Sequence, residues 1–141
     1  MDNNLYNKAY AFAIRITNAY QFLSKEKREF ILSKQLLRSG TSIGANVAEA
    51  NGAISKADFS AKISISYKEC LETKYWLSLL KDTNYIDQNT FESVFQDADE
   101  LAKILFTILK KSRINTYQFR LIPNILITDI LNIDTLIHGS I

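Results

Sequence analysis

Hydrophobic side chains recur at alternating spacings of three and four residues in four separate segments of the chain. That spacing places them on one face of an α-helix, so each segment predicts an amphipathic helix with an apolar face to bury. The first two stripes are Leu5, Ala9, Phe12, Ile16, Ala19 and Leu23, then Leu32, Leu36, Ile43, Val47, Ala50 and Ile54. The other two are Phe59, Ile63, Ser66, Cys70, Thr73, Leu77 and Leu80, then Phe91, Val94, Ala98, Leu101, Leu105 and Ile108.

Short polar segments between the stripes predict where the helices begin and end. Ser55 and Asp58 form an S-x-x-D pattern, in which the serine accepts from a first-turn amide and the aspartate accepts from the amide of the serine itself. Asp87 or Asn89 can cap the fourth helix, and a basic run at 110–113 suits its C-terminal end. Short connections make consecutive helices antiparallel neighbours. The sequence therefore predicts an all-α, up-down-up-down four-helix bundle over residues 1–113.

Residues 114–141 form a C-terminal extension of different composition. It contains the only proline, Pro123, followed by an Ile/Leu-rich run. A helical stripe is present there, although isoleucine would also suit a strand. We favour a short fifth helix that docks on the bundle or on a neighbouring chain. The stripe consists of Leu126, Ile130, Ile133 and Ile137.

Composition supports the helices and excludes several classes of protein. Four glycines and one proline in 141 residues cannot supply the turns of a β-sandwich or barrel. A net charge of +2 by itself indicates neither nucleic acid nor a membrane, and no uncharged apolar stretch is long enough to span a bilayer. One cysteine and one histidine leave no disulfide and no zinc site. We expect a cytoplasmic protein without a metal, a cofactor, a small-molecule substrate or a membrane partner.

One segment resembles a catalytic motif. Residues 40–44 match GxSxG, the serine nucleophile elbow of α/β-hydrolases. That elbow needs a strand before Ser42, whereas the preceding residues have helical spacing, and the only histidine, His138, lies near the C-terminus. Cys70 occupies a core position and is interpreted as a small buried hydrophobe. We therefore expect no catalytic residues and no enzyme activity.

Small residues recur every four positions along the second predicted helix, on a side distinct from its apolar stripe. Each glycine inside a helix costs about 1 kcal/mol relative to alanine, so the ridge predicts close packing against another helix of this chain or of a second one. Alternatively, Gly52 only ends the helix and Gly40 marks a kink. The ridge consists of Gly40, Gly44, Ala48 and Gly52.

A polar side of the same helix carries Arg38 and Glu49, about 16 Å apart along the axis and too far apart to pair with each other. If the second and third helices meet at a tight turn near residue 55, Arg38 lies beside Leu71. The register thus predicts a buried ion pair of Arg38 with Glu69 first and Glu72 second. The alternative is a solvated face, as is usual for charges on a surface helix.

Positive charge is concentrated in the first third of the chain. Residues 1–45 hold seven bases against three acids, a balance of +4, whereas the rest of the chain is neutral or negative. In a cyclic assembly these cations would form a ring able to bind RNA phosphates. Alternatively, the charges only keep a loop soluble. The candidate nucleic-acid-binding residues are Lys8, Arg15, Lys25, Lys27, Arg28 and Lys34.

Two patterns carry a resemblance to a known family over about residues 5–113. The second predicted helix reads R-x-x-x-S-I-x-x-N-x-A-E, and the third contains S-x-x-E. This resembles the four-helix-bundle family of proteins encoded in intervening sequences of bacterial 23S rRNA genes, also called S23 ribosomal proteins, to which the accessory variability protein of diversity-generating retroelements is related. The chain departs from the family at Ala50, often a glycine, and in its extension. The motif residues are Gln35, Arg38, Ser42, Ile43, Asn46, Ala48, Glu49, Ser66 and Glu69.

The resemblance implies a homopentamer without enzymatic activity, whose partners are RNA or a reverse transcriptase. Together with the charge asymmetry, it predicts a non-enzymatic oligomeric scaffold that binds RNA, or an RNA-associated protein, through a basic surface. The alternative is a structural protein-protein interaction module that binds no nucleic acid.

Overall fold

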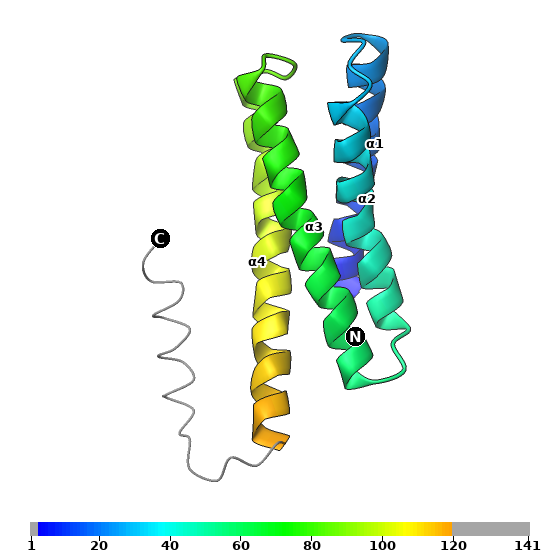
Figure 1. Ribbon diagram of the computed structural model, residues 1–141, viewed down its shortest axis with the longest axis vertical. Helices are drawn as coiled ribbons and strands as arrows, with labels where there is room; N and C mark the ends of the chain where they lie inside the picture. Colours follow the sequence, from blue (N-terminus) through cyan, green and yellow to red (C-terminus); the bar gives the residue numbers. More distant parts are fainter. Residues whose placement is uncertain (1–2, 120–141) are drawn as a thin grey trace, which may run out of the picture. The chain divides into compact units, whose positions relative to one another are not determined.

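The computed structural model describes the backbone of residues 3–119 and the side chains of residues 4–112. This part of the chain consists of α1 (Asn3–Lys25), α2 (Leu32–Asn51), α3 (Lys56–Asp82) and α4 (Gln88–Phe119) (Figure 1). Consecutive helices run in opposite directions, so the predicted all-α, up-down-up-down bundle is confirmed. The bundle forms one unit up to Leu109, and α4 continues past the end expected at residue 113. The helix predicted after Pro123 lies outside the described residues.

The core of the bundle is built from the four predicted stripes. Every helix contributes side chains that are almost completely buried, which removes the apolar faces from water. The stripe of α2 is wrong at its last position, because α2 ends at Asn51 and Ile54 is exposed. Ser39, which stands between Leu36 and Ile43 in this stripe, is buried and accepts a hydrogen bond of 2.9 Å from Thr73 Oγ1 of α3. The largest buried side chains include Phe12, Ile16, Leu23, Leu36, Ile43, Ile63, Leu77, Leu80 and Leu105.

Close packing of α1 on α2 requires glycine at one of the four small residues in the ridge. A Cβ atom added at Gly40 would lie 2.7 Å from Ile16 Cγ1, and one at Gly44 would lie 3.4 Å from the Ala9 carbonyl oxygen. Ala48 is exposed, and Gly52 is the exposed residue that ends α2, its amide donating to the Glu49 carbonyl at 3.1 Å. Within the described unit, close approach of α1 therefore requires glycine at Gly40, whereas Gly44 makes an ordinary contact with α1.

The caps of α3 and α4 explain where these helices begin. Ser55 Oγ accepts a 3.0 Å hydrogen bond from the Asp58 amide, as the sequence predicts. The Asp58 carboxylate accepts from the Ile54 amide at 3.2 Å, one residue earlier than the expected amide of Ser55. Of the two candidates for α4, Asp87 is the cap, since its Oδ1 accepts from the Thr90 amide at 2.7 Å and this bond lowers the pKa of Asp87.

The cap of α2 was not predicted. Glu29 is buried, and its carboxylate accepts hydrogen bonds from the amides of Ile31, Leu32 and Ser33 at 3.0, 2.9 and 2.6 Å. Burial raises the pKa of Glu29, but these three amides and the Ser33 hydroxyl outweigh that effect, so the pKa lies below its ordinary value. A charged residue in the α1–α2 turn thus anchors the start of α2.

Candidate functional site

The six basic residues proposed from the sequence fall into two groups. Lys8 and Arg15 lie on the side of α1 that faces α4. Lys8 forms an ion pair with Glu100, and Arg15 pairs with Asp97 at 2.5 Å. A further hydrogen bond of 2.9 Å joins Arg15 Nη2 to Ser93 Oγ. Both cations therefore have acidic partners within the bundle, and their role in phosphate binding stays a prediction.

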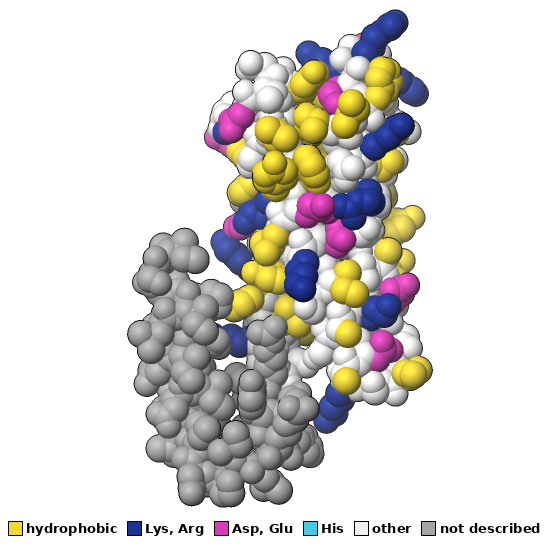
Figure 2. Space-filling view, in the orientation of Figure 1, with side chains coloured by type: hydrophobic (Ala, Val, Ile, Leu, Met, Phe, Trp, Pro, Cys, Tyr) yellow, Lys and Arg dark blue, Asp and Glu magenta, His cyan; other side chains and the backbone are white. Residues whose placement is uncertain are grey.

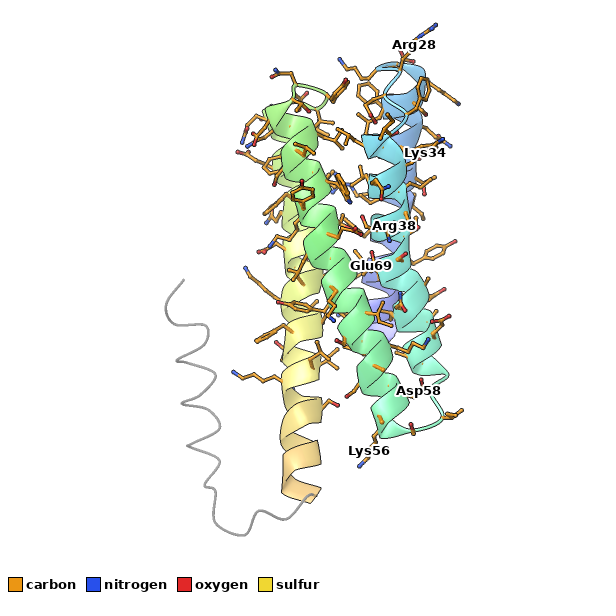
Figure 3. The ribbon with its side chains drawn as sticks, in the orientation of Figure 1. Arg28, Lys34, Arg38, Lys56, Asp58 and Glu69 are labelled. Carbon is orange, nitrogen blue, oxygen red and sulfur yellow. The ribbon has the colours of Figure 1, made fainter. Side chains whose placement is uncertain are left out.

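The other four cations gather at the turn between α1 and α2, which we call the basic turn (Lys25, Lys27, Arg28 and Lys34). All four are exposed, and no ion pair joins any of them to an acid of the described residues. Figure 3 shows Arg28 and Lys34 at this end of the bundle, pointing away from it. The acids of the turn do not cancel this charge, since Glu29 is occupied by the cap and only Glu26 is exposed.

Apolar side chains are exposed next to the four cations of the basic turn. Phe22, Phe30 and Ile31 are 45, 52 and 76% exposed. The Lys27 ammonium lies 5.9 Å from the centroid of the Phe22 ring, within range of a cation-π contact. In Figure 2, hydrophobic and basic side chains lie side by side at this end of the molecule. The turn thus combines uncompensated positive charge with exposed rings.

A second polar cluster joins α2 to α3. Arg38 contacts Glu72 through Nη2 and Glu69 through Nη1, the latter at 3.4 Å. Figure 3 labels Arg38 on α2 and Glu69 on α3. The predicted partners are present, but Glu72 makes the shorter contact, and the prediction of a buried pair is wrong because the Arg38 side chain is 49% exposed. The Glu72 hydrogen bond raises the pKa of Arg38, whereas burial raises the pKa of Glu69 against the opposing effect of Arg38.

The remaining polar motif residues form hydrogen bonds and ion pairs within α2 or between α2 and α3. Ser42 Oγ donates to the Arg38 carbonyl at 2.7 Å, and Asn46 Nδ2 donates to the Ser42 carbonyl at 2.8 Å, both within α2. Ser66 Oγ of α3 is buried and donates to the Ile43 carbonyl of α2 at 2.9 Å. Glu49 forms an ion pair of 3.1 Å with Lys62 across the same interface. The Ser66 hydrogen bond and the Glu49–Lys62 ion pair thus join α2 to α3.

The arrangement around Ser42 differs from that of a nucleophile elbow. Residues 40–44 lie inside α2, so no strand-to-helix turn presents the hydroxyl. Burial raises the pKa of the Cys70 thiol to about 12, which keeps it protonated. The described residues contain no cluster of His, Cys, Asp and Glu with the geometry of a metal site, and His138 lies outside them. No helix in this part of the chain combines the length and apolar character needed to cross a bilayer.

Comparison with known proteins agrees with this architecture. The model of the 23S rRNA-intervening sequence protein family matches residues 1–107. A crystal structure of a protein of unknown function from the S23 ribosomal protein family of Bacteroides thetaiotaomicron VPI-5482 is 51% identical, with a TM-score of 0.75. The similarity covers 75% of this chain and 98% of that one. No curated protein matches the sequence. Because the family match covers most of the bundle, the chain belongs to the 23S rRNA-intervening sequence protein family.

Proposed function

We propose that this protein is a non-enzymatic, self-associating scaffold that binds RNA through the basic turn. The observation that carries the proposal is the set of four exposed cations, none of which is paired with an acid of the described residues. Binding to a phosphate backbone gains free energy by releasing counterions, and paired cations such as Lys8 and Arg15 contribute less to that release. The proposed site is therefore narrower than the six residues considered from the sequence.

Self-association is supported by the outward face of α1. Between Asn3 and Ser24 this helix has only two charged residues, Lys8 and Arg15, and both pair with α4. Tyr10 and Ile14 are exposed, each two residues from the buried Phe12 and thus about 200° around the helix from it. A face depleted of charge and containing exposed aromatic side chains is typical of the centre of a protein interface.

A closed ring follows from this face if it contacts a different surface of the next subunit. The family resemblance favours five subunits. Each subunit would contribute one basic turn, so a ring multiplies the number of phosphates that can be neutralised together. Light scattering at micromolar concentration tests this step, and a species of only 16 kDa would contradict it.

A filter-binding assay tests the RNA proposal. The variant Lys25→Gln, Lys27→Gln and Arg28→Gln should lose most RNA retention at about 50 mM salt, because it removes three of the four cations. A control variant removes the same charge from α3 and α4 through Lys68→Gln, Lys103→Gln and Lys111→Gln, and it should bind like the parent. Equal loss in both variants would show dependence on net charge alone and contradict a specific site.

The alternative is a protein-protein interaction module that binds no nucleic acid. The observation that favours it is the outer face of α3, where Leu71 and Tyr75 are exposed one helical turn apart. Such a face could receive another protein, including an RNA-associated enzyme such as a reverse transcriptase. Absence of RNA retention by the parent protein at about 50 mM salt would favour this alternative.

A further inference from the structure

The basic turn exposes more apolar surface than phosphate binding requires. Phe22 is the residue before Leu23, the last core residue of α1, and its ring is turned away from the core. Phe30 and Ile31 precede the first residue of α2, and both are at least half exposed. Lysine and arginine alone suffice for contacts to phosphates, so the three apolar side chains call for a separate explanation.

The residue at the start of α2 strengthens this argument. Ile31 is the N-cap residue, a position where serine, threonine, aspartate and asparagine are strongly preferred because they accept from free amides. Here the carboxylate of Glu29, two residues earlier, accepts from these amides, so the residue at position 31 does not need a polar side chain. Local helix chemistry thus does not account for an exposed isoleucine at this position. The apolar side chains are a property of the surface of the turn.

We propose that the turn binds single-stranded RNA, with bases stacked on Phe22 and Phe30 and phosphates held by Lys25, Lys27, Arg28 and Lys34. This inference rests on the RNA binding proposed above and names the class of RNA. Phe22 is followed by Lys25, Lys27 and Arg28, and Phe30 stands between these cations and Lys34, so each ring has cations near it in the chain. Aromatic platforms in a basic groove bind single strands without sequence preference, because every base has a stacking face.

Duplex RNA does not fit the same surface. Its bases are stacked on one another inside the helix, and its major groove is too deep and narrow for side chains to reach them. A duplex would therefore contact the cations and leave both phenyl rings in water. The ammonium of Lys27 already lies near the ring of Phe22, so a base can stack there while Lys27 moves to the adjacent phosphate. Unpaired bases are the part of RNA that the rings can recognise.

A protein partner is disfavoured by the size of the apolar patch. Three side chains provide much less than the roughly 800 Å² that each partner buries in a standard interface. An anionic membrane surface is the remaining competitor, since cations flanked by apolar side chains also suit lipid headgroups. Binding to vesicles of phosphatidylserine and phosphatidylcholine distinguishes this competitor from RNA.

Fluorescence anisotropy with a labelled unstructured 12-nucleotide RNA and a 12-base-pair RNA duplex tests the proposal on the full chain. The single strand should bind at least tenfold more tightly than the duplex. Phe22→Ala and Phe30→Ala should each weaken single-strand binding about tenfold, with no effect on duplex binding. Since neither variant removes a cation, the salt dependence should stay unchanged. Tyr75→Ala, which removes a slightly more exposed ring from α3, is the matched control and should bind like the parent.

Two further variants separate stacking from simple apolar contact. Phe30→Leu keeps an apolar side chain and should lose affinity as Phe30→Ala does. Phe30→Trp should retain affinity, and its added fluorescence should be quenched on RNA binding, above the constant signal of Trp76. Both positions are exposed, so helix content by circular dichroism should match the parent in every variant.

The outcomes distinguish this inference from the proposed function. If RNA binds and depends on the lysines but not on Phe22 and Phe30, the stacking inference is wrong and RNA binding stands. If the duplex binds as tightly as the single strand, the same conclusion follows. If the parent binds no RNA, both proposals are wrong. If Phe30→Leu retains full affinity and the parent binds vesicles of phosphatidylserine and phosphatidylcholine more tightly than RNA, the turn is a membrane-binding surface and the inference is overturned.

Discussion

Replacement of Gly40 by alanine measures how closely α1 and α2 pack. The added Cβ would lie 2.7 and 2.8 Å from Ile16 Cγ1 and Cγ2, and 3.2 Å from Ile16 Cβ. Ile16 is fully buried, and its β-branched side chain is stiff about χ1, so it cannot move away at low cost. Alanine must therefore push the two helices apart or force the isoleucine out of its preferred rotamer.

Two opposing effects set the size of the change. Alanine favours the helix by about 1 kcal/mol relative to glycine, whereas overpacking of a close-packed core costs about 1–3 kcal/mol. Because both γ carbons are contacted at once, we place the overpacking cost near the upper end of that range. Gly40→Ala should then lower the free energy of unfolding by about 1–2 kcal/mol, which corresponds to a decrease of about 0.5–1 M in the urea midpoint.

Urea unfolding followed by circular dichroism at a fixed protein concentration gives this value, and Gly44→Ala is the matched control. At Gly44 the added Cβ meets the Ala9 carbonyl oxygen at 3.4 Å, an ordinary contact, so that variant should be unchanged or up to about 1 kcal/mol more stable. Ile16→Ala removes both clashing carbons, so combining it with Gly40→Ala should cost at least about 1 kcal/mol less than the sum of the single changes. A Gly40→Ala midpoint equal to or above that of the parent would refute the close approach.

Three other experiments test the cap of α2 at Glu29, the contacts of Arg38 with α3, and the burial of Cys70. Glu29→Gln should destabilise the fold by about 1–2 kcal/mol in urea unfolding at pH 7, since the amide group cannot replace all three accepting contacts. Because the folded pKa of Glu29 is lowered, its contribution is present above the unfolded pKa and lost as pH falls through the folded pKa; the parent should therefore lose stability below about pH 4.5 and the variant should lose less. Arg38→Ala should cost only about 0.5–1 kcal/mol, as for an exposed pair, and a loss above about 3 kcal/mol would show a buried one. Cys70 should react with an aromatic disulfide reagent only at the rate of unfolding, and rapid reaction in the native protein would contradict its burial.

The parts of the fold that follow a short-range rule could be predicted from the sequence. Periodicity is a local property, so the buried faces of the helices were identified, including the small polar core residues Ser66 and Thr73. The Ser55 cap depends on a residue three positions away. Even the partners of Arg38 followed from the short α2–α3 turn, which fixes how the two helices align.

Features that depend on how distant helices are rotated could not be predicted. The partners of Lys8 and Arg15 lie on α4, more than eighty residues away in each case, and no turn geometry fixes that register. These ion pairs are the reason why the proposed site is centred on the basic turn. The burial of Arg38 was overestimated for the same reason, because it depends on what covers the outer side of α2 and α3.

The cap of α2 was missed because its sequence lacks the usual signal. Position 31 holds an isoleucine, so a search for a polar N-cap finds no candidate there. The signal that could have revealed Glu29 is an acidic residue just before an apolar start, with Ser33 four residues later to return a hydrogen bond of 2.6 Å to the Glu29 carbonyl. Recognising this cap also shows which acid of the turn is unavailable to neutralise the cations.

The dependence of RNA affinity on salt tests the central claim most directly. For single-stranded RNA the slope of log affinity against log salt changes by about 0.7 for each cation that contacts a phosphate. The variant Lys25→Gln, Lys27→Gln and Arg28→Gln should therefore bind with a slope shallower by about 2 per contacting subunit, whereas the control variant at Lys68, Lys103 and Lys111 should keep the slope of the parent. Equal slopes for parent and basic-turn variant, or no binding by the parent at about 50 mM salt, would contradict RNA binding through the basic turn.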